Sequence, residues 1–109
     1  MTVNLQFPKG NAASDCAHFA SELLRLGSNE VDIDCPDTET TMCVLRCAHF
    51  FQLPHDWALH GLLRVDVSPL LKSPIARLTQ PADLYAHIEN QMRARQYNRQ
   101  PETMETVSG

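Results

Sequence analysis

Two short segments that share one pattern, Val31-Asp32-Ile33 and Val65-Asp66-Val67, set the main limits on how this chain folds. In each segment an acidic residue separates two apolar ones, which is the period-2 pattern of a strand with one buried face. Segments with helical spacing lie between and around them, over about 14–26, 39–51 and 82–97. Strands that alternate with helices predict an α/β fold.

The signals at the ends of these segments give the rest of the expected architecture. The alternating run 2–7 predicts a further strand. Ser14 or Asp15 is a suitable cap for the first helix, and Gly27 lies where a glycine commonly ends one. Asp37 or Thr38 can cap the second helix, and 52–61 is expected to be a loop that follows it. Pro69 and Pro74 each follow a serine, which predicts two short helical pieces in place of one long helix. We therefore expect a small, mostly parallel or mixed sheet of three to four strands packed with three to four helices.

Composition and length indicate one ordinary globular domain. The 109 residues are 43% apolar and 20% charged, typical of a single folded unit. We expect the domain to span 1–97 and to be followed by a disordered tail at 98–109, which is polar and lacks periodicity. Residues 39–51 are apolar around most of a helical circumference, so this second helix is expected to be the most buried element.

Charge and hydropathy exclude several classes of partner. The net charge of −4 argues against a nucleic-acid or anionic-membrane surface, which requires a basic face. The sequence has no apolar run of the ~20 residues that a membrane span requires, and its first ten residues do not resemble a secretory signal. The expected location is therefore the cytoplasm.

Four cysteines are the residues most suggestive of chemistry, namely Cys16, Cys35, Cys43 and Cys47. Cys43 and Cys47 are one helical turn apart, but the spacing of the four does not match the paired knuckles of structural zinc sites. Cys35 precedes a helix, and a helix N-terminus can lower the pKa of a thiol, but Cys35 lacks a C-x-x-C partner. We expect reduced, buried thiols, no metal, no cofactor and no enzymatic activity. A small cysteine-dependent redox or metal-binding protein, or a stand-alone inhibitor or adaptor, remains the alternative.

Three sequence segments resemble the STAS domain family. They are Val31-Asp32-Ile33-Asp34, the helix opening 39–45, and Leu63-Arg64-Val65-Asp66-Val67-Ser68-Pro69. That family includes anti-sigma factor antagonists and the small STAS subunit of lipid-transport ABC systems. The resemblance covers about 3–88, although the D-S-x-G motif of the family is degenerate here.

The resemblance implies a regulatory protein-binding module whose partner is an anti-sigma kinase or a transporter subunit. In that family the partner meets the start of the second helix, which corresponds here to Asp37, Thr38, Thr40 and Thr41. Thr41 falls nearest the phosphorylatable serine of the family and Thr40 nearest its Asp. Thr41 or Thr40 would carry the phosphate, which would disrupt a packed contact. Trp57, in the following connection, is a suitable interface anchor. The alternative is that the threonines only cap the helix.

Overall fold

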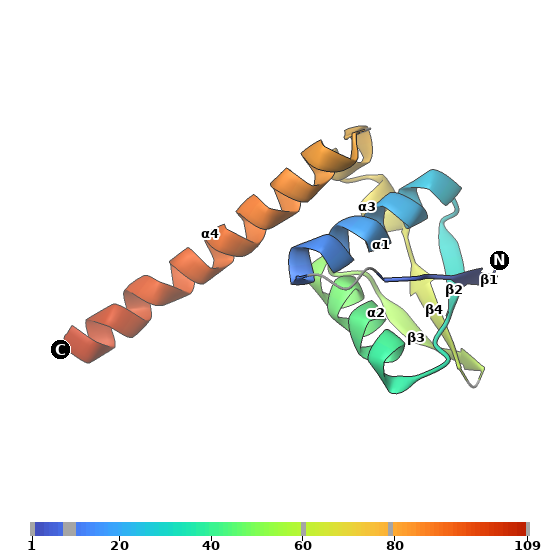
Figure 1. The fold of residues 1–109 in the computed structure, drawn as a ribbon, viewed down its shortest axis with the longest axis horizontal. Helices are drawn as coiled ribbons and strands as arrows, with labels where there is room; N and C mark the ends of the chain where they lie inside the picture. Colours follow the sequence, from blue (N-terminus) through green and yellow to red (C-terminus); the bar gives the residue numbers. More distant parts are fainter. Residues whose placement is uncertain (1, 8–10, 60, 79, 109) are drawn as a thin grey trace.

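The computed structural model describes residues 2–7, 11–59, 61–78 and 80–108, with side chains described as far as residue 95. Its elements, in chain order, are β1 (Thr2–Asn4), α1 (Ala12–Leu26), β2 (Glu30–Asp34), α2 (Thr38–Phe50), β3 (His55–Leu59), β4 (Leu62–Asp66), α3 (Ser68–Leu71), the 3₁₀ helix η1 (Pro74–Arg77) and α4 (Pro81–Ser108). Figure 1 shows this path from the N-terminal strand to the long C-terminal helix.

The four strands form one mixed sheet in the order β1-β2-β4-β3. β1 and β2 are parallel, whereas β2 with β4 and β4 with β3 are antiparallel. The predicted α/β class and the alternative of a mixed sheet are confirmed, whereas a mostly parallel sheet is wrong. The reason is the tight turn that joins β3 to β4 at Gly61, whose φ of 79° is readily available to glycine. This turn makes an antiparallel hairpin in place of a helical crossover.

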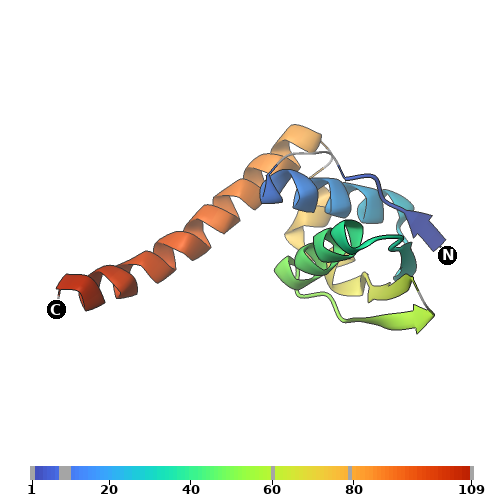
Figure 2. The same ribbon diagram turned by 60° about the horizontal axis from the view of Figure 1, so that its bottom comes forward.

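α1 and α2 cover one face of the sheet, so the domain has two layers. Figure 2 shows both helices on one side of β3 and β4. The central strands point alternate residues at these helices, and Val31, Ile33, Leu63 and Val65 are buried there. The opposite face carries polar side chains, as in antiparallel sheets with one solvated face.

α1 begins and ends on clear local signals. Its N-cap is Asn11, whose side chain accepts a hydrogen bond from the N–H of Ser14. The prediction that Ser14 or Asp15 caps this helix is therefore wrong by one turn: Asn11 is equally suited to the role and lies where the extended backbone ends. Gly27 ends the helix in the left-handed conformation, as predicted.

α2 is buried on one side only, so the expectation that it is the most buried element is wrong. Val44, Cys47 and Ala48 are fully buried, whereas Met42 is 62% exposed and Leu45 is half-buried. α1 reaches deeper into the core, with residues such as Phe19 and Leu23 fully enclosed. An apolar residue on α2 is buried only where another element packs against it, and the number of apolar residues around the helix does not show where that is.

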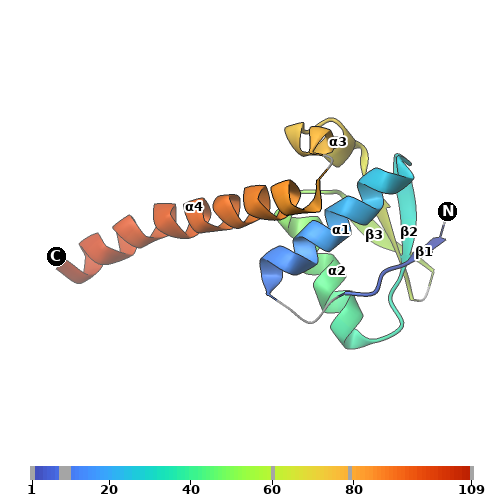
Figure 3. The same cartoon turned by 45° about the horizontal axis from the view of Figure 1, so that its top comes forward.

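The C-terminal part confirms the two short helical pieces. Pro69 and Pro74 occupy the first turns of α3 and η1. α4 then packs on α1 through its first turns and extends away from the sheet (Figures 1 and 3). The helix continues past the expected end at residue 97, and disorder of 98–109 in solution stays a prediction. Within the described residues no helix has the length and apolar character needed to cross a membrane.

Candidate functional site

The start of α2 is organised by Asp37, which is its N-cap. The carboxylate oxygen Oδ1 of Asp37 accepts the N–H of Thr40 at 2.7 Å, and this bond lowers the pKa of Asp37 below its ordinary value of 3.8. The Thr41 hydroxyl donates to the backbone oxygen of Asp37, also at 2.7 Å. Of the two predicted caps, Asp37 and Thr38, the structure uses Asp37 and leaves Thr38 exposed.

Thr40 and Asp37 also line a hollow of about 260 Å³ between the segment after β1 and the start of α2. Leu5 and Phe7 form part of its opposite wall, and Cys43 closes it on the helix side. Two of the predicted partner-binding residues at the start of α2, Asp37 and Thr40, thus border a shallow depression. Thr40 is half-buried and Asp37 is exposed, whereas Thr38 and Thr41 are not among the residues that line the hollow.

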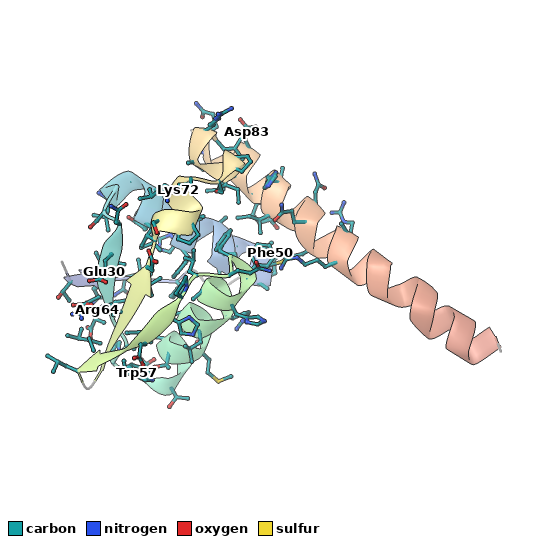
Figure 4. All side chains as sticks on the ribbon, turned by 180° about the vertical axis from the view of Figure 1, so that it is seen from behind. Glu30, Phe50, Trp57, Arg64, Lys72 and Asp83 are labelled. Atoms are coloured by element: carbon teal, nitrogen blue, oxygen red, sulfur yellow. The ribbon has the colours of Figure 1, made fainter. Side chains whose placement is uncertain are left out.

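Trp57 lies on a strand, which the sequence did not predict. The segment expected to be a loop, 52–61, contains β3, the edge strand of the sheet. Trp57 is 49% exposed, and its position opposite the buried Leu63 places it on the side of the sheet that the helices cover (Figure 4). Trp57 therefore lies on the same side of the sheet as α2, on a strand in place of the expected loop.

Large apolar side chains are exposed on β3 and on α2. Among the residues whose side chains are described, the exposed large apolar ones are Met42 on α2 and Trp57 and Leu59 on β3, at 62%, 49% and 67%. Trp57 and Leu59 also line a shallow hollow of about 400 Å³ with Ala58 and Gly61. Exposed apolar side chains that occur together mark interaction sites more often than scattered ones do. We refer to Met42, Trp57, Leu59 and the first turn of α2 as the β3 edge surface.

The open face of the sheet next to this surface is acidic. Glu30, Asp32 and Asp34 on β2 share it with Asp66 on β4 and Asp56 on β3, as the strand registers show. Arg64 is the basic residue among them; it pairs with Asp32 at 2.9 Å and with Glu30 at 3.6 Å. Figure 4 shows Glu30 and Arg64 next to each other. The Arg64 guanidinium lowers the pKa of Asp32 through this hydrogen bond.

The four cysteines differ in burial and in the direction of their pKa shifts, and a hydrogen bond with Cys47 lowers the pKa of Cys16. All are free thiols, and Cys16, Cys35 and Cys47 are buried. Burial raises the pKa of Cys35, and the neighbouring Cys16 thiol together with burial raises the pKa of Cys47, so both thiols are held in their neutral forms. Within the described part of the chain, no three His, Cys, Asp or Glu side chains are grouped so as to hold a metal ion.

Comparison with known proteins adds no relative: no protein-family model, no curated protein and no solved structure matches this chain.

Proposed function

We propose that this chain is a non-enzymatic, regulatory protein-binding domain and that it binds its partner through the β3 edge surface. The observation that carries the proposal is the placement of Met42, Trp57 and Leu59. These exposed apolar side chains lie on one edge of the sheet and on the helix beside it. Tryptophan is among the residues that contribute most to binding energy at interfaces. The STAS resemblance supplies the partner class, an anti-sigma kinase-like protein or a transporter subunit.

Thr41 is the proposed regulatory position, with Thr40 as the second choice. Its hydroxyl now donates to Asp37, and phosphorylation would remove that donor. The phosphate would also place nearly two negative charges beside Asp37 and Glu39, at the border of the β3 edge surface. A partner that packs closely there would lose affinity. The fold would be affected less, because negative charge in the first turn of a helix is favourable.

Co-purification from the native host tests the surface. We expect the double variant Trp57→Ser/Leu59→Ser to lose the partner that the wild-type chain retains, with the same far-UV circular dichroism and a similar melting temperature. Arg25→Ser, an exposed change at the end of α1, is the matched control and should retain the partner. Full retention by the double variant would contradict the proposed surface.

The regulatory residue is tested with a charge-matched pair of variants. Thr41→Glu should weaken binding of the purified partner by about 1–3 kcal/mol relative to Thr41→Gln, which has the same size without the charge. Equal affinities for the two variants would remove Thr41 from the proposal without affecting the surface itself.

A further inference from the structure

We propose that β3 binds an extended segment of the partner as a fifth strand, and that this segment alternates apolar with basic residues. The inference rests on the proposed function, because it names the mode of binding and the partner chemistry for the same β3 edge surface. Addition of a strand to a free sheet edge is a known mode of peptide recognition, in which backbone hydrogen bonds contribute affinity and alternate side chains contribute specificity.

The backbone of β3 offers the required hydrogen-bonding groups. The N–H of Asp66 donates to the oxygen of Pro54 at 2.9 Å, so the opposed residues Pro54 and Asp66 form a hydrogen-bonded pair of the antiparallel ladder. Because hydrogen-bonded and non-hydrogen-bonded pairs alternate, Asp56 also bonds inward to β4. It follows that His55 and Trp57 direct their N–H and C=O groups away from β4, toward the free edge.

No described element covers that edge. β3 is the last strand of the sheet, and four of its five residues are exposed. An uncovered edge strand is a template for pairing with another chain unless a charge or a bulge protects it. Both devices are present here: the ladder is irregular between Trp57 and Leu59, and the Asp56 carboxylate accepts the N–H of Trp57 at 2.9 Å. Of the hydrogen bonds among the described residues, an incoming strand at His55 and Trp57 would displace this one, and the irregularity limits pairing beyond Trp57.

The side chains of β3 determine which residues suit an incoming strand. Trp57 is opposite Leu63 and therefore lies on the helix-covered side of the sheet, where a guest side chain next to Trp57 should be apolar. Asp56 lies on the open side, opposite Arg64. The guanidinium of Arg64 is engaged by Asp32 and Glu30, and Asp56 takes part in none of the ion pairs among the described side chains. A lysine or arginine of the guest would compensate this charge.

The same charges argue against a second copy of this chain as the occupant. A pairing of two β3 strands that uses the outward groups of both His55 and Trp57 sets His55 opposite Trp57 of the other copy. Asp56 is then directly opposite Asp56 of the other copy. Like charges in that position destabilise a strand pair. Complementarity of charge therefore favours a partner strand with basic residues over self-association.

Calorimetric titration with three synthetic peptides tests the inference. Each peptide has blocked ends and alternates valine with lysine, serine or glutamate. We expect the Val/Lys peptide to bind the full chain about tenfold or more tightly than the Val/Glu peptide. Asp56→Asn should reduce this difference. Equal affinity for the three peptides, or binding of none of them, would overturn the inference.

Two variants of one residue isolate the backbone contribution. His55→Pro removes the outward N–H, whereas His55→Ala removes the same imidazole and keeps the N–H. We expect His55→Pro to bind the Val/Lys peptide about tenfold more weakly than His55→Ala. If His55→Pro fails to fold, slower amide exchange of His55 and Trp57 in the wild-type chain with saturating peptide provides the same information. Unchanged exchange at both amides would count against strand addition.

The outcomes separate this inference from the proposed function. If Trp57→Ser/Leu59→Ser loses the native partner while His55→Pro and His55→Ala retain it equally, the surface is right and strand addition is wrong. If the double variant retains the partner, the proposed function itself fails. A dimer in sedimentation velocity that His55→Pro alone abolishes would identify a second copy as the occupant and overturn the inference.

Discussion

Helices α1 and α2 end in the same left-handed backbone conformation, with glycine in one case and glutamine in the other. At the end of α1, Gly27 has a φ of 68° and donates its N–H to the oxygen of Leu23. At the end of α2, Gln52 has a φ of 56° and donates to His49, while Leu53 donates to Ala48. The second pattern is a Schellman ending, in which glycine is the favoured residue. We therefore predict that Gln52→Gly stabilises the protein and that Gly27→Ala destabilises it.

The expected sizes follow from the backbone geometry. A left-handed conformation costs a residue with a Cβ roughly 1–2 kcal/mol. Glycine avoids this cost but brings a more flexible unfolded state, which removes about 0.4–1 kcal/mol of the gain. Gln52→Gly should thus raise the free energy of unfolding by about 0.5–1 kcal/mol. A Cβ at Gly27 would meet no atom within 4 Å, so the loss in Gly27→Ala, of about the same size, is conformational only.

Urea unfolding followed by far-UV circular dichroism measures both changes. The slope of free energy against denaturant should stay the same in all variants, so that shifts in midpoint report stability. Gln52→Ala is the control: it keeps the Cβ and should remain close to the wild type. The reasoning would be refuted if Gln52→Gly were less stable than Gln52→Ala, or if Gly27→Ala unfolded at the wild-type midpoint.

Three further predictions concern the core, the helix cap and the thiols. Leu23→Ala, at a fully buried position, should cost about 2–5 kcal/mol of unfolding free energy, whereas Met42→Ala, on the exposed side of α2, should cost less than about 0.5 kcal/mol. Denaturant midpoints of the two variants measure these losses, and equal losses would contradict the assigned faces. The pKa of Asp37 is lowered in the folded state, so its ionisation stabilises the fold fully above the ordinary carboxyl pKa of 3.8, and this contribution disappears as pH falls through the lowered value. Asp37→Ala should therefore lose less stability on acidification than the wild type. Parallel losses would argue against the cap. Cys47, which is fully buried, should be alkylated only as fast as the protein unfolds, whereas the half-buried Cys43 should react sooner. Mass spectrometry of partly modified protein measures this order, and earlier modification of Cys47 would contradict the packing.

Local patterns in the sequence predicted the elements that local chemistry controls. The alternation around Asp32 and Asp66 predicted β2 and β4. Gly27 was predicted to end α1, and Asp37 was one of the two predicted caps at the start of α2. In each case the residue itself determines the backbone, through a buried face, a side-chain cap or a left-handed turn. The α/β class follows from the order of these elements.

The misses occurred where neighbours far apart in the sequence decide the structure. β3 shows no alternation because most of it is exposed on both faces, so its pairing with β4 becomes visible only in three dimensions. The same strand moved Trp57 from an expected loop to a sheet edge. The sequence offered Asp37 as a cap for α2, which is a local feature. It gave no signal for the free hydrogen-bonding groups of His55 on β3, on which the proposed strand addition depends.

The position of Trp57 has a consequence for spectroscopy of this protein. It is the chain's only tryptophan, and it lies on the edge strand, about half exposed, and not in the core. Its fluorescence therefore reports the state of the β3–β4 hairpin, while the ellipticity at 222 nm reports the helices. A difference between the two unfolding curves would show fraying of one edge of the sheet, and would not by itself indicate an intermediate of the whole domain.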